Sequence, residues 1–277
     1  MFHVDHPSRA RLRIETARPR PFVARGIDWP VMSWTPERLA ALAGDVTVRY
    51  LVYDPQPGGR NEDGLRTEAV PLRAFIERHV LQNTPGPSPI APYVDEYNHR
   101  LLQVPRLRAD LQGLVGVRPR DGVFGPRVVY VRAHPWIGPA NTRSGLHRDH
   151  NAGLLLQVHG RKRVYLWSPS REGDMHPSQR FESQATISEV DVFGQELPDD
   201  LAMVPRLSVV LGPGDALFIP SRMWHAARSL EPSVSISLSG YTPYDLAEFG
   251  AHDVLHRLHL YRWGECACHG GGRRYWW

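Results

Sequence analysis

Cysteine and lysine are nearly absent from this chain of 277 residues. The two cysteines, Cys266 and Cys268, stand too close together for an ordinary disulfide bridge between separate elements. A secreted fold held together by disulfides is therefore not indicated, and a reducing cytoplasm is the simplest setting. Lys162 is the only lysine among the 33 Lys and Arg residues.

Long apolar runs are missing as well. No stretch of about 18 consecutive apolar residues occurs, so we predict no transmembrane helix and no membrane partner. Residues 1–13 carry charges and histidines but no apolar centre of a secretory signal. The formal net charge is +4 and the isoelectric point is about 9.3. Because the arginines are scattered rather than clustered, we expect a solvated surface rather than a nucleic-acid partner.

His147 and Asp149 form an H-x-D motif. Residues i and i+2 of a strand point to the same face, so one imidazole and one carboxylate would project side by side. The motif alone is a weak signal in a chain with 14 histidines, and isolated ones such as His159 and His176 are expected to be solvated or packed. Its surroundings strengthen it, because residues 154–169 read as a strand, a tight glycine turn and a second strand.

A second imidazole is available further along the chain, at His225. It follows a Gly-Pro-Gly-Asp turn and an apolar strand over residues 216–219, and an alternating strand over residues 233–239 comes after it. Two histidines and one carboxylate make the facial triad that holds non-haem Fe(II) and leaves positions open for other ligands. We therefore predict that His147, Asp149 and His225 meet as metal ligands inside a barrel.

Lys162 lies on the strand that follows the H-x-D motif. A compact ammonium on a flexible stem and a planar guanidinium are not interchangeable in a narrow pocket. The functional interpretation is a point charge that binds a ligand carboxylate. The plain alternative is that a single lysine codon has persisted by drift.

Residues 144–169 and 212–237 resemble the JmjC/cupin-like Fe(II)- and 2-oxoglutarate-dependent oxygenases, above all the small JmjC hydroxylases of the factor-inhibiting-HIF type. The resemblance implies a mainly β fold with helical flanks around a double-stranded β-helix, the jelly-roll or cupin core. It implies that His147, Asp149 and His225 bind the iron and form the catalytic centre. Lys162 matches the lysine that pairs with the distal carboxylate of 2-oxoglutarate, and Ser144 matches a hydroxyl that bonds the same carboxylate.

Two further positions bear on the cosubstrate. Tyr93 opens a segment that, in this family, brings a phenol to the 2-oxoglutarate carboxylate; Tyr97 is the alternate, and a tyrosine packed at the barrel edge is the plain interpretation. Many members carry Asn four residues after the metal-binding Asp, whereas Gly153 stands there in this chain and Asn151 is out of register. The departure implies that cofactor binding relies on other groups.

The expected organisation has three parts. Residues 1–127 form an N-terminal α/β flank, residues 128–245 the double-stranded β-helix core, and residues 246–277 a C-terminal helix and tail. Apart from residues 185–192, the stretch 170–206 lacks a clear period, and we interpret it as a long insert between barrel strands, the kind of loop that often carries substrate contacts.

Local signals place several elements in the flank. Thr35 and Pro36 predict the start of a helix that ends at Gly44. Residues 46–53 alternate and predict a strand, and residues 72–81 have the spacing of a short amphipathic helix.

The C-terminal part has helical spacing over residues 246–263. In related hydroxylases a C-terminal helical segment pairs two subunits, so the resemblance allows a homodimer through this segment. The tail sequence Cys266, Cys268 and His269 resembles half of a zinc site, but no partner pair stands out among the remaining residues, and we favour a loosely packed tail.

The predicted activity is hydroxylation of an unactivated C–H bond, first on a protein or peptide side chain, with Fe(II), 2-oxoglutarate as cosubstrate and O2. Hydroxylation is preferred over demethylation because the chain is short and lacks reader or zinc modules. Three alternatives stay open: the same chemistry on a small metabolite, a non-redox cupin metalloenzyme of the isomerase type, and an inactive binding barrel. Lys162 argues against the second, and the complete triad argues against the third.

Overall fold

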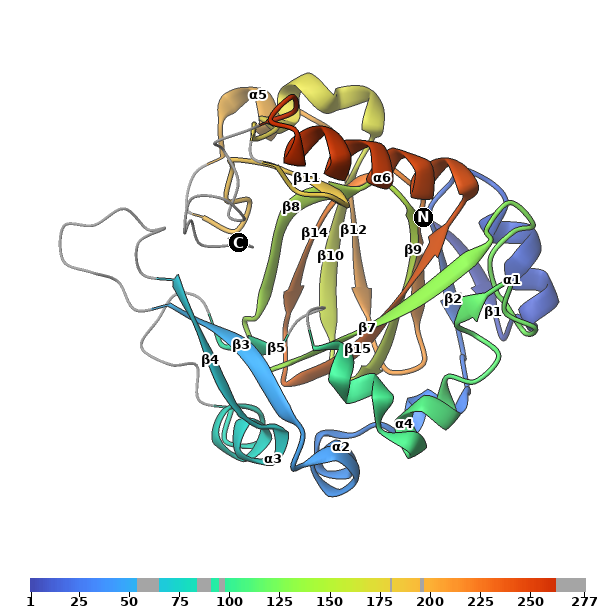
Figure 1. Ribbon diagram of the computed structural model, residues 1–277, viewed down its shortest axis with the longest axis vertical. Coiled ribbons are helices and arrows are strands. Elements are labelled where there is room, and N and C mark those ends of the chain that lie inside the picture. Colours follow the sequence, from blue (N-terminus) through green and yellow to red (C-terminus); the bar gives the residue numbers. More distant parts are fainter. Residues whose placement is uncertain (54–64, 84–90, 95–97, 180, 195–196, 263–277) are drawn as a thin grey trace.

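Two β-sheets face each other at the centre of the molecule, one of ten strands and one of five (Figure 1). The structure is a computed structural model, and it describes residues 1–53, 65–83, 91–94, 98–179, 181–194 and 197–262.

Successive barrel strands alternate between the two sheets, except that β10 and β12 lie side by side in the smaller one. The larger sheet contributes neighbours in the order β13 (Ala216–Ile219), β9 (Ala152–His159), β15 (Ser233–Tyr241) and β7 (Tyr130–Gly138). The smaller sheet contributes β8 (Arg143–Asp149), β14 (Trp224–Ser229), β10 (Lys162–Trp167) and β12 (Arg206–Leu211). All these neighbours pair antiparallel. Chain and sheet order together form the predicted double-stranded β-helix, so the expected fold class is confirmed.

Strands from the N-terminal part join the larger sheet directly. One edge carries β1 (Phe2–Asp5) and β2 (Phe22–Arg25), with β2 beside β13. The other edge carries β5 (Tyr93–Val94), β3 (Thr47–Tyr53) and β4 (Leu65–Pro71), and β6 (Gly116–Val117) pairs with β7. The smaller sheet gains β11 (Ala185–Ile187) beside β8. The N-terminal part therefore helps to build the barrel wall.

Short helices of the N-terminal part cover the outer face of the larger sheet. They are α1 (Arg9–Thr16), α2 (Pro36–Ala43), α3 (Leu72–Phe75), which continues as the π-helical η3 (Ile76–Leu81), α4 (Pro105–Asp110), and the 3-10 turns η1 (Pro30–Ser33) and η4 (His99–Gln103). The Thr35 side chain accepts a hydrogen bond from the Arg38 amide, as its predicted role as N-cap requires. Leu39 and Phe75 are fully buried in one core with Leu154 of β9, so apolar burial holds this layer on the sheet.

The predicted insert lies against the outer face of the smaller sheet. It contains η5 (Pro169–Met175) and α5 (Asp199–Ala202) as well as β11. Met175 and Leu201 pack in one buried cluster with Trp167 of β10 and Trp224 of β14. The insert is therefore a structural layer in its described residues.

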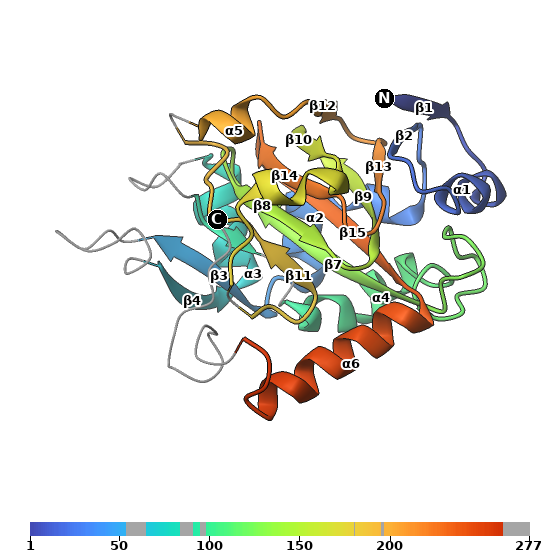
Figure 2. The same ribbon diagram turned by 90° about the horizontal axis from the view of Figure 1, so that it is seen from above.

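Helix α6 (Pro243–Arg257) lies across one end of the barrel (Figure 1), and Figure 2 shows it from above. It begins before the predicted residue 246 because Thr242 and Asp245 form a capping box around Pro243. It ends at Arg257, before the predicted residue 263, and two residues later His259 adopts a positive φ of 64°, which a right-handed helix does not allow. Within the described part of the chain, no helix is long and apolar enough to span a bilayer.

Candidate metal centre and pocket

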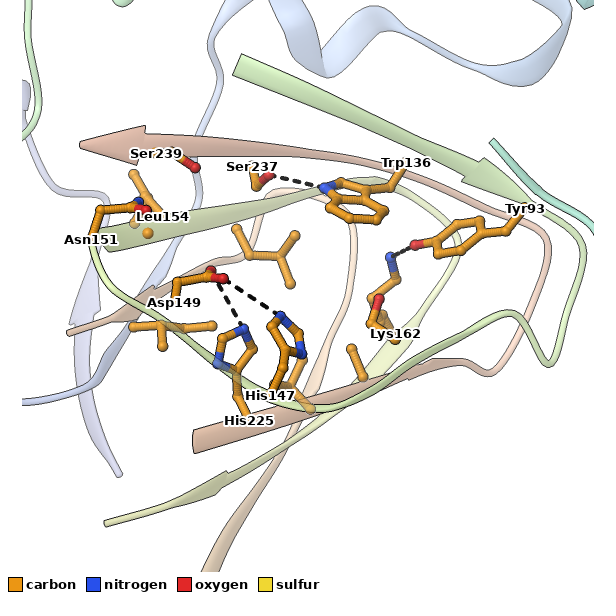
Figure 3. Close-up of a pocket in the computed structure, with 16 residues that line it drawn as sticks. Tyr93, Trp136, His147, Asp149, Asn151, Leu154, Lys162, His225, Ser237 and Ser239 are labelled. Carbon is orange, nitrogen blue, oxygen red and sulfur yellow. Dashed lines mark hydrogen bonds and ion pairs between the residues drawn. The ribbon is translucent and has the colours of Figure 1, made fainter. Parts of the chain in front are cut away.

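His147 and His225 stand directly opposite each other on the neighbouring strands β8 and β14. Side chains of directly paired residues project to the same face, and the two imidazole centroids are 4.1 Å apart. Asp149 adds a carboxylate there: its Oδ1 is 3.7 Å from His147 Nε2 and its Oδ2 is 3.8 Å from His225 Nε2. The structure thus brings the three predicted ligands together at one point (Figure 3), with all potential ligand atoms within 4.8 Å of one another.

Backbone carbonyls orient both imidazoles. His147 Nδ1 lies 2.8 Å from the Gly145 carbonyl oxygen, and His225 Nδ1 lies 2.9 Å from that of Met223. A carbonyl oxygen can only accept a hydrogen bond, so the Nδ1–H group of each imidazole is the donor. The lone pair of each Nε2 is then directed to the side where Asp149 lies. Burial first, and then the neighbouring His147, lower the pKa of His225 to about 4, so it is a neutral ligand at pH 7. Neutral imidazoles and a carboxylate are the donor set that fits Fe(II).

Lys162 begins β10 and is 2% exposed. It shares a strand face with Leu166, which pairs with His225 across to β14, so its side chain also enters the barrel. Its Nζ donates a hydrogen bond of 3.0 Å to the hydroxyl of Tyr93 on β5, in the facing sheet. Burial lowers the pKa of Lys162 to about 7, and no carboxylate of the described residues offsets that effect.

A pocket of about 80 Å³ connects these groups, several times the space that one water molecule needs. Figure 3 shows the candidate metal ligands His147, Asp149 and His225 on one side and Lys162 with Tyr93 on the other. Trp136 of β7 lies beside Tyr93, with ring centroids 5.5 Å apart, and its indole N–H donates to Ser237 Oγ at 2.9 Å. Neither Trp136 nor Ser237 is among the site residues predicted from the sequence. The available signal was the serine at every second position of residues 233–239, which leaves one strand face small and polar.

The remaining predicted cosubstrate positions also face the pocket. Ser144 of β8 lines it, and so do both Asn151 and Gly153. A Cβ built at Gly153 would meet nothing within 4 Å, so a side chain there would project into open space. Asn151, two residues earlier, is buried and lines the same pocket although it is out of register with the family position.

Several predicted roles lie beyond what the structure describes. Tyr97, Cys266, Cys268 and His269 fall outside the described residues. His176, which was expected not to be a ligand, lies 2.9 Å from a carboxylate oxygen of Asp200, away from the pocket.

A double-stranded β-helix with a His-Asp-His cluster at an interior pocket defines a cupin-type barrel with a candidate metal centre. The chain belongs to the cupin-like domain family, whose sequence pattern matches residues 8–239. The family resemblance predicted from the motifs is thereby confirmed.

Characterised relatives match most of this chain. It is 30% identical over 247 residues to lysine-specific demethylase 8 of Danio rerio, covering 83% of this chain and 56% of that protein. It is 30% identical over 217 residues to Jumonji C domain-containing protein 5 of Drosophila melanogaster, covering 76% and 51%. It is 26% identical over 266 residues to an HSPB1-associated protein 1 homolog of Danio rerio, covering 87% and 55%. The chain thus spans about half the length of these relatives.

Proposed function

We propose that this chain is an Fe(II)- and 2-oxoglutarate-dependent oxygenase that hydroxylates an unactivated C–H bond on a protein or peptide side chain. In the proposed reaction, the C–H carbon and 2-oxoglutarate each receive one atom of O2, and the products are the alcohol, succinate and CO2. The donor set of His147, Asp149 and His225 supports the metal assignment. Three relatives, from Danio rerio, Xenopus tropicalis and Arabidopsis thaliana, carry the name lysine-specific demethylase, which supports a macromolecular substrate.

The observation that carries the proposal is the buried pair of Lys162 and Tyr93. An ammonium in an apolar environment is costly without an anionic partner. Lys162 has three N–H donors, its one hydrogen bond among the described residues goes to the Tyr93 hydroxyl, and it faces the same pocket as the metal cluster. A dicarboxylate with one end on the metal and the other end on Lys162 would supply the missing charge. A barrel that uses its metal without such a cosubstrate has no need of this lysine.

In this proposal, different residues of the chain bind the metal and the cosubstrate. His147, Asp149 and His225 would hold the metal, which when bound supplies the activation of O2. Lys162, Tyr93 and the Ser144 hydroxyl would orient the distal carboxylate through charge-assisted hydrogen bonds. The side chain of Asp149 is 36% exposed, so the metal side of the pocket is open to a substrate that enters from solvent.

Anaerobic titration of 2-oxoglutarate into the Fe(II)-loaded protein tests the proposal. A visible metal-to-ligand absorption band that saturates at one equivalent is the expected result. The matched control is Lys162→Met, which keeps the stem and should require far more 2-oxoglutarate. Iron binding without any band would refute the oxygenase proposal and favour a non-redox cupin metalloenzyme. Succinate release with peptide pools or with small metabolites then separates the two substrate classes.

A further inference from the structure

Helix α6 presents an unusual face to the barrel. The residues buried or half-buried on it recur at helical spacing, and all but one are polar or charged: Asp245, Glu248, Phe249, His252, Asp253 and His256. Its large aliphatic residues, by contrast, are exposed: Leu246, Val254 and Leu255. The hydrophobic effect therefore contributes little to holding α6 on the barrel, and polar groups must supply the attachment.

Three of the inward groups form a compact cluster. Glu248 and His252 are four residues apart and so lie on one face of α6. His150, which directly follows β8, meets them: its Nδ1 is 3.8 Å from Glu248 Oε2. One potential ligand atom from each of the three residues lies within 4.8 Å of the other two. The cluster of His147, Asp149 and His225 is built from the same ligand types, two imidazoles and one carboxylate, and its ligand atoms lie within the same limit of 4.8 Å.

One nitrogen atom of each imidazole in this cluster has no hydrogen bond among the described residues, while His150 Nε2 lies 3.5 Å from the Thr186 hydroxyl oxygen. The side chain of His150 is 7% exposed, and its Nδ1 makes no hydrogen bond in the described structure. The same holds for the buried Nδ1 of His252. Buried polar atoms are nearly always hydrogen-bonded, so two orphaned imidazole nitrogens beside one carboxylate call for an explanation.

We infer that His150, Glu248 and His252 form a second metal site, which takes a divalent transition ion of the zinc class and fastens α6 to the end of β8. Two imidazoles exclude Ca²⁺ and Mg²⁺ as preferred occupants, because those ions select oxygen ligands. Three protein ligands leave a further position for water, as in other His₂-carboxylate sites. The inference is independent of the oxygenase proposal.

Arg222 holds the carboxylate of this site in place. Its Nη2 donates to both oxygens of Glu248 at 2.7 Å, while its backbone N–H donates to the Asp149 carbonyl oxygen at 2.7 Å. A carboxylate has lone pairs for more than one partner, and ligating carboxylates are commonly hydrogen-bonded in this way. Since the arginine neutralises the charge of Glu248, we expect micromolar rather than tighter zinc affinity. The contacts also join α6 to the strand that carries His147 and Asp149.

The test uses the full chain with the first site disabled by His147→Ala and His225→Ala. This double variant, freed of metal, is dialysed against Zn²⁺ and then Co²⁺, and bound ions are counted. We expect it to retain one more ion than a triple variant that also carries His252→Asn, and Zn²⁺ should raise its melting temperature by several degrees more. Glu248→Gln should weaken binding by ten- to a hundred-fold.

Matched controls separate ligation from a general change of charge. Asp253→Asn makes the carboxylate-to-amide change on the same helix, and His176→Asn removes a histidine elsewhere; neither should alter the ion count. The expected Co²⁺ spectrum has visible d–d bands without a thiolate charge-transfer band, which would instead place the ion on Cys266 and Cys268. Equal ion counts with and without His252, or a spectrum dominated by thiolate, would overturn the second site.

Discussion

Replacing Lys162 with Met should stabilise the metal-free protein while damaging its cosubstrate site. Burial lowers the pKa of this lysine from 10.5 to about 7, and a pKa change of one corresponds to about 1.4 kcal/mol. The unfolded chain binds a proton that the folded chain gives up, so folding loses stability as the pH falls from 10.5 to about 7. Below about 7 the loss is constant, at roughly 4–5 kcal/mol. A Met side chain carries no charge and avoids this loss of stability. It removes only the hydrogen bond to Tyr93, which contributes about 1 kcal/mol.

The pH dependence isolates this effect from the other changes that the substitution makes. Between pH 9 and pH 7 the stability advantage of Lys162→Met over the wild type should grow by about 2–3 kcal/mol. Urea unfolding of both proteins at the two pH values measures it, because contributions common to both proteins cancel. Arg163→Met, at the exposed neighbouring position of the same strand, is the control and should show no such growth.

The same variant should separate cosubstrate binding from metal binding. Calorimetry under nitrogen with Fe(II)- or Mn(II)-loaded protein should show metal affinity near wild type and 2-oxoglutarate affinity lower by about ten- to a few-hundred-fold. A stability advantage that does not change between pH 7 and pH 9 would refute the account of a desolvated lysine. Unchanged 2-oxoglutarate affinity would refute its role toward the cosubstrate.

Further predictions concern the same pocket and α6. Asp149→Ala should abolish stoichiometric iron binding while circular dichroism shows a retained fold; tight binding would contradict the ligand assignment. Tyr93→Phe should lower 2-oxoglutarate affinity by about three- to ten-fold by calorimetry, since one hydrogen bond is lost. At pH 8, 2-oxoglutarate binding should take up close to one proton, because the dianion restores the charge of Lys162; equal heats in buffers of different ionisation enthalpy would argue against it. Val254 and Leu258 are 55% and 61% exposed and lie four residues apart at the C-terminal end of α6, and we propose that they form a contact between two copies of the chain. Replacing both residues with Glu should convert a dimer into a monomer in analytical sedimentation. A wild-type protein that sediments as a monomer would exclude this contact.

Local periodicity made most of the metal cluster predictable. The i, i+2 spacing of His147 and Asp149 determines that both side chains share a strand face, whatever the rest of the fold does. The apolar and alternating strands around His225, with the turn before them, identified the partner strand. Lys162 stood out by composition alone, as the only lysine of the chain.

The register between strands that are distant in the chain could not be predicted from the sequence. That His225 stands opposite His147, and that Lys162 reaches Tyr93 in the facing sheet, depends on how β14 aligns with β8 and how the sheets pack. A shift of one residue would turn each side chain to the other face, and no local pattern fixes that alignment. Trp136 was missed for this reason, because its neighbours in the pocket come from other strands.

The sequence by itself determined several individual strands, the H-x-D pair and the single lysine, since each follows from composition or from spacing along one element, whereas the jelly-roll was implied by the family resemblance. Only the tertiary structure decided which face of α6 meets the barrel. Helical spacing places Glu248 and His252 side by side, but burial of a polar rather than an apolar face, against His150 at the end of β8, follows from packing between segments about a hundred residues apart. Physical proximity across such a distance is set by the summed contacts of the whole fold.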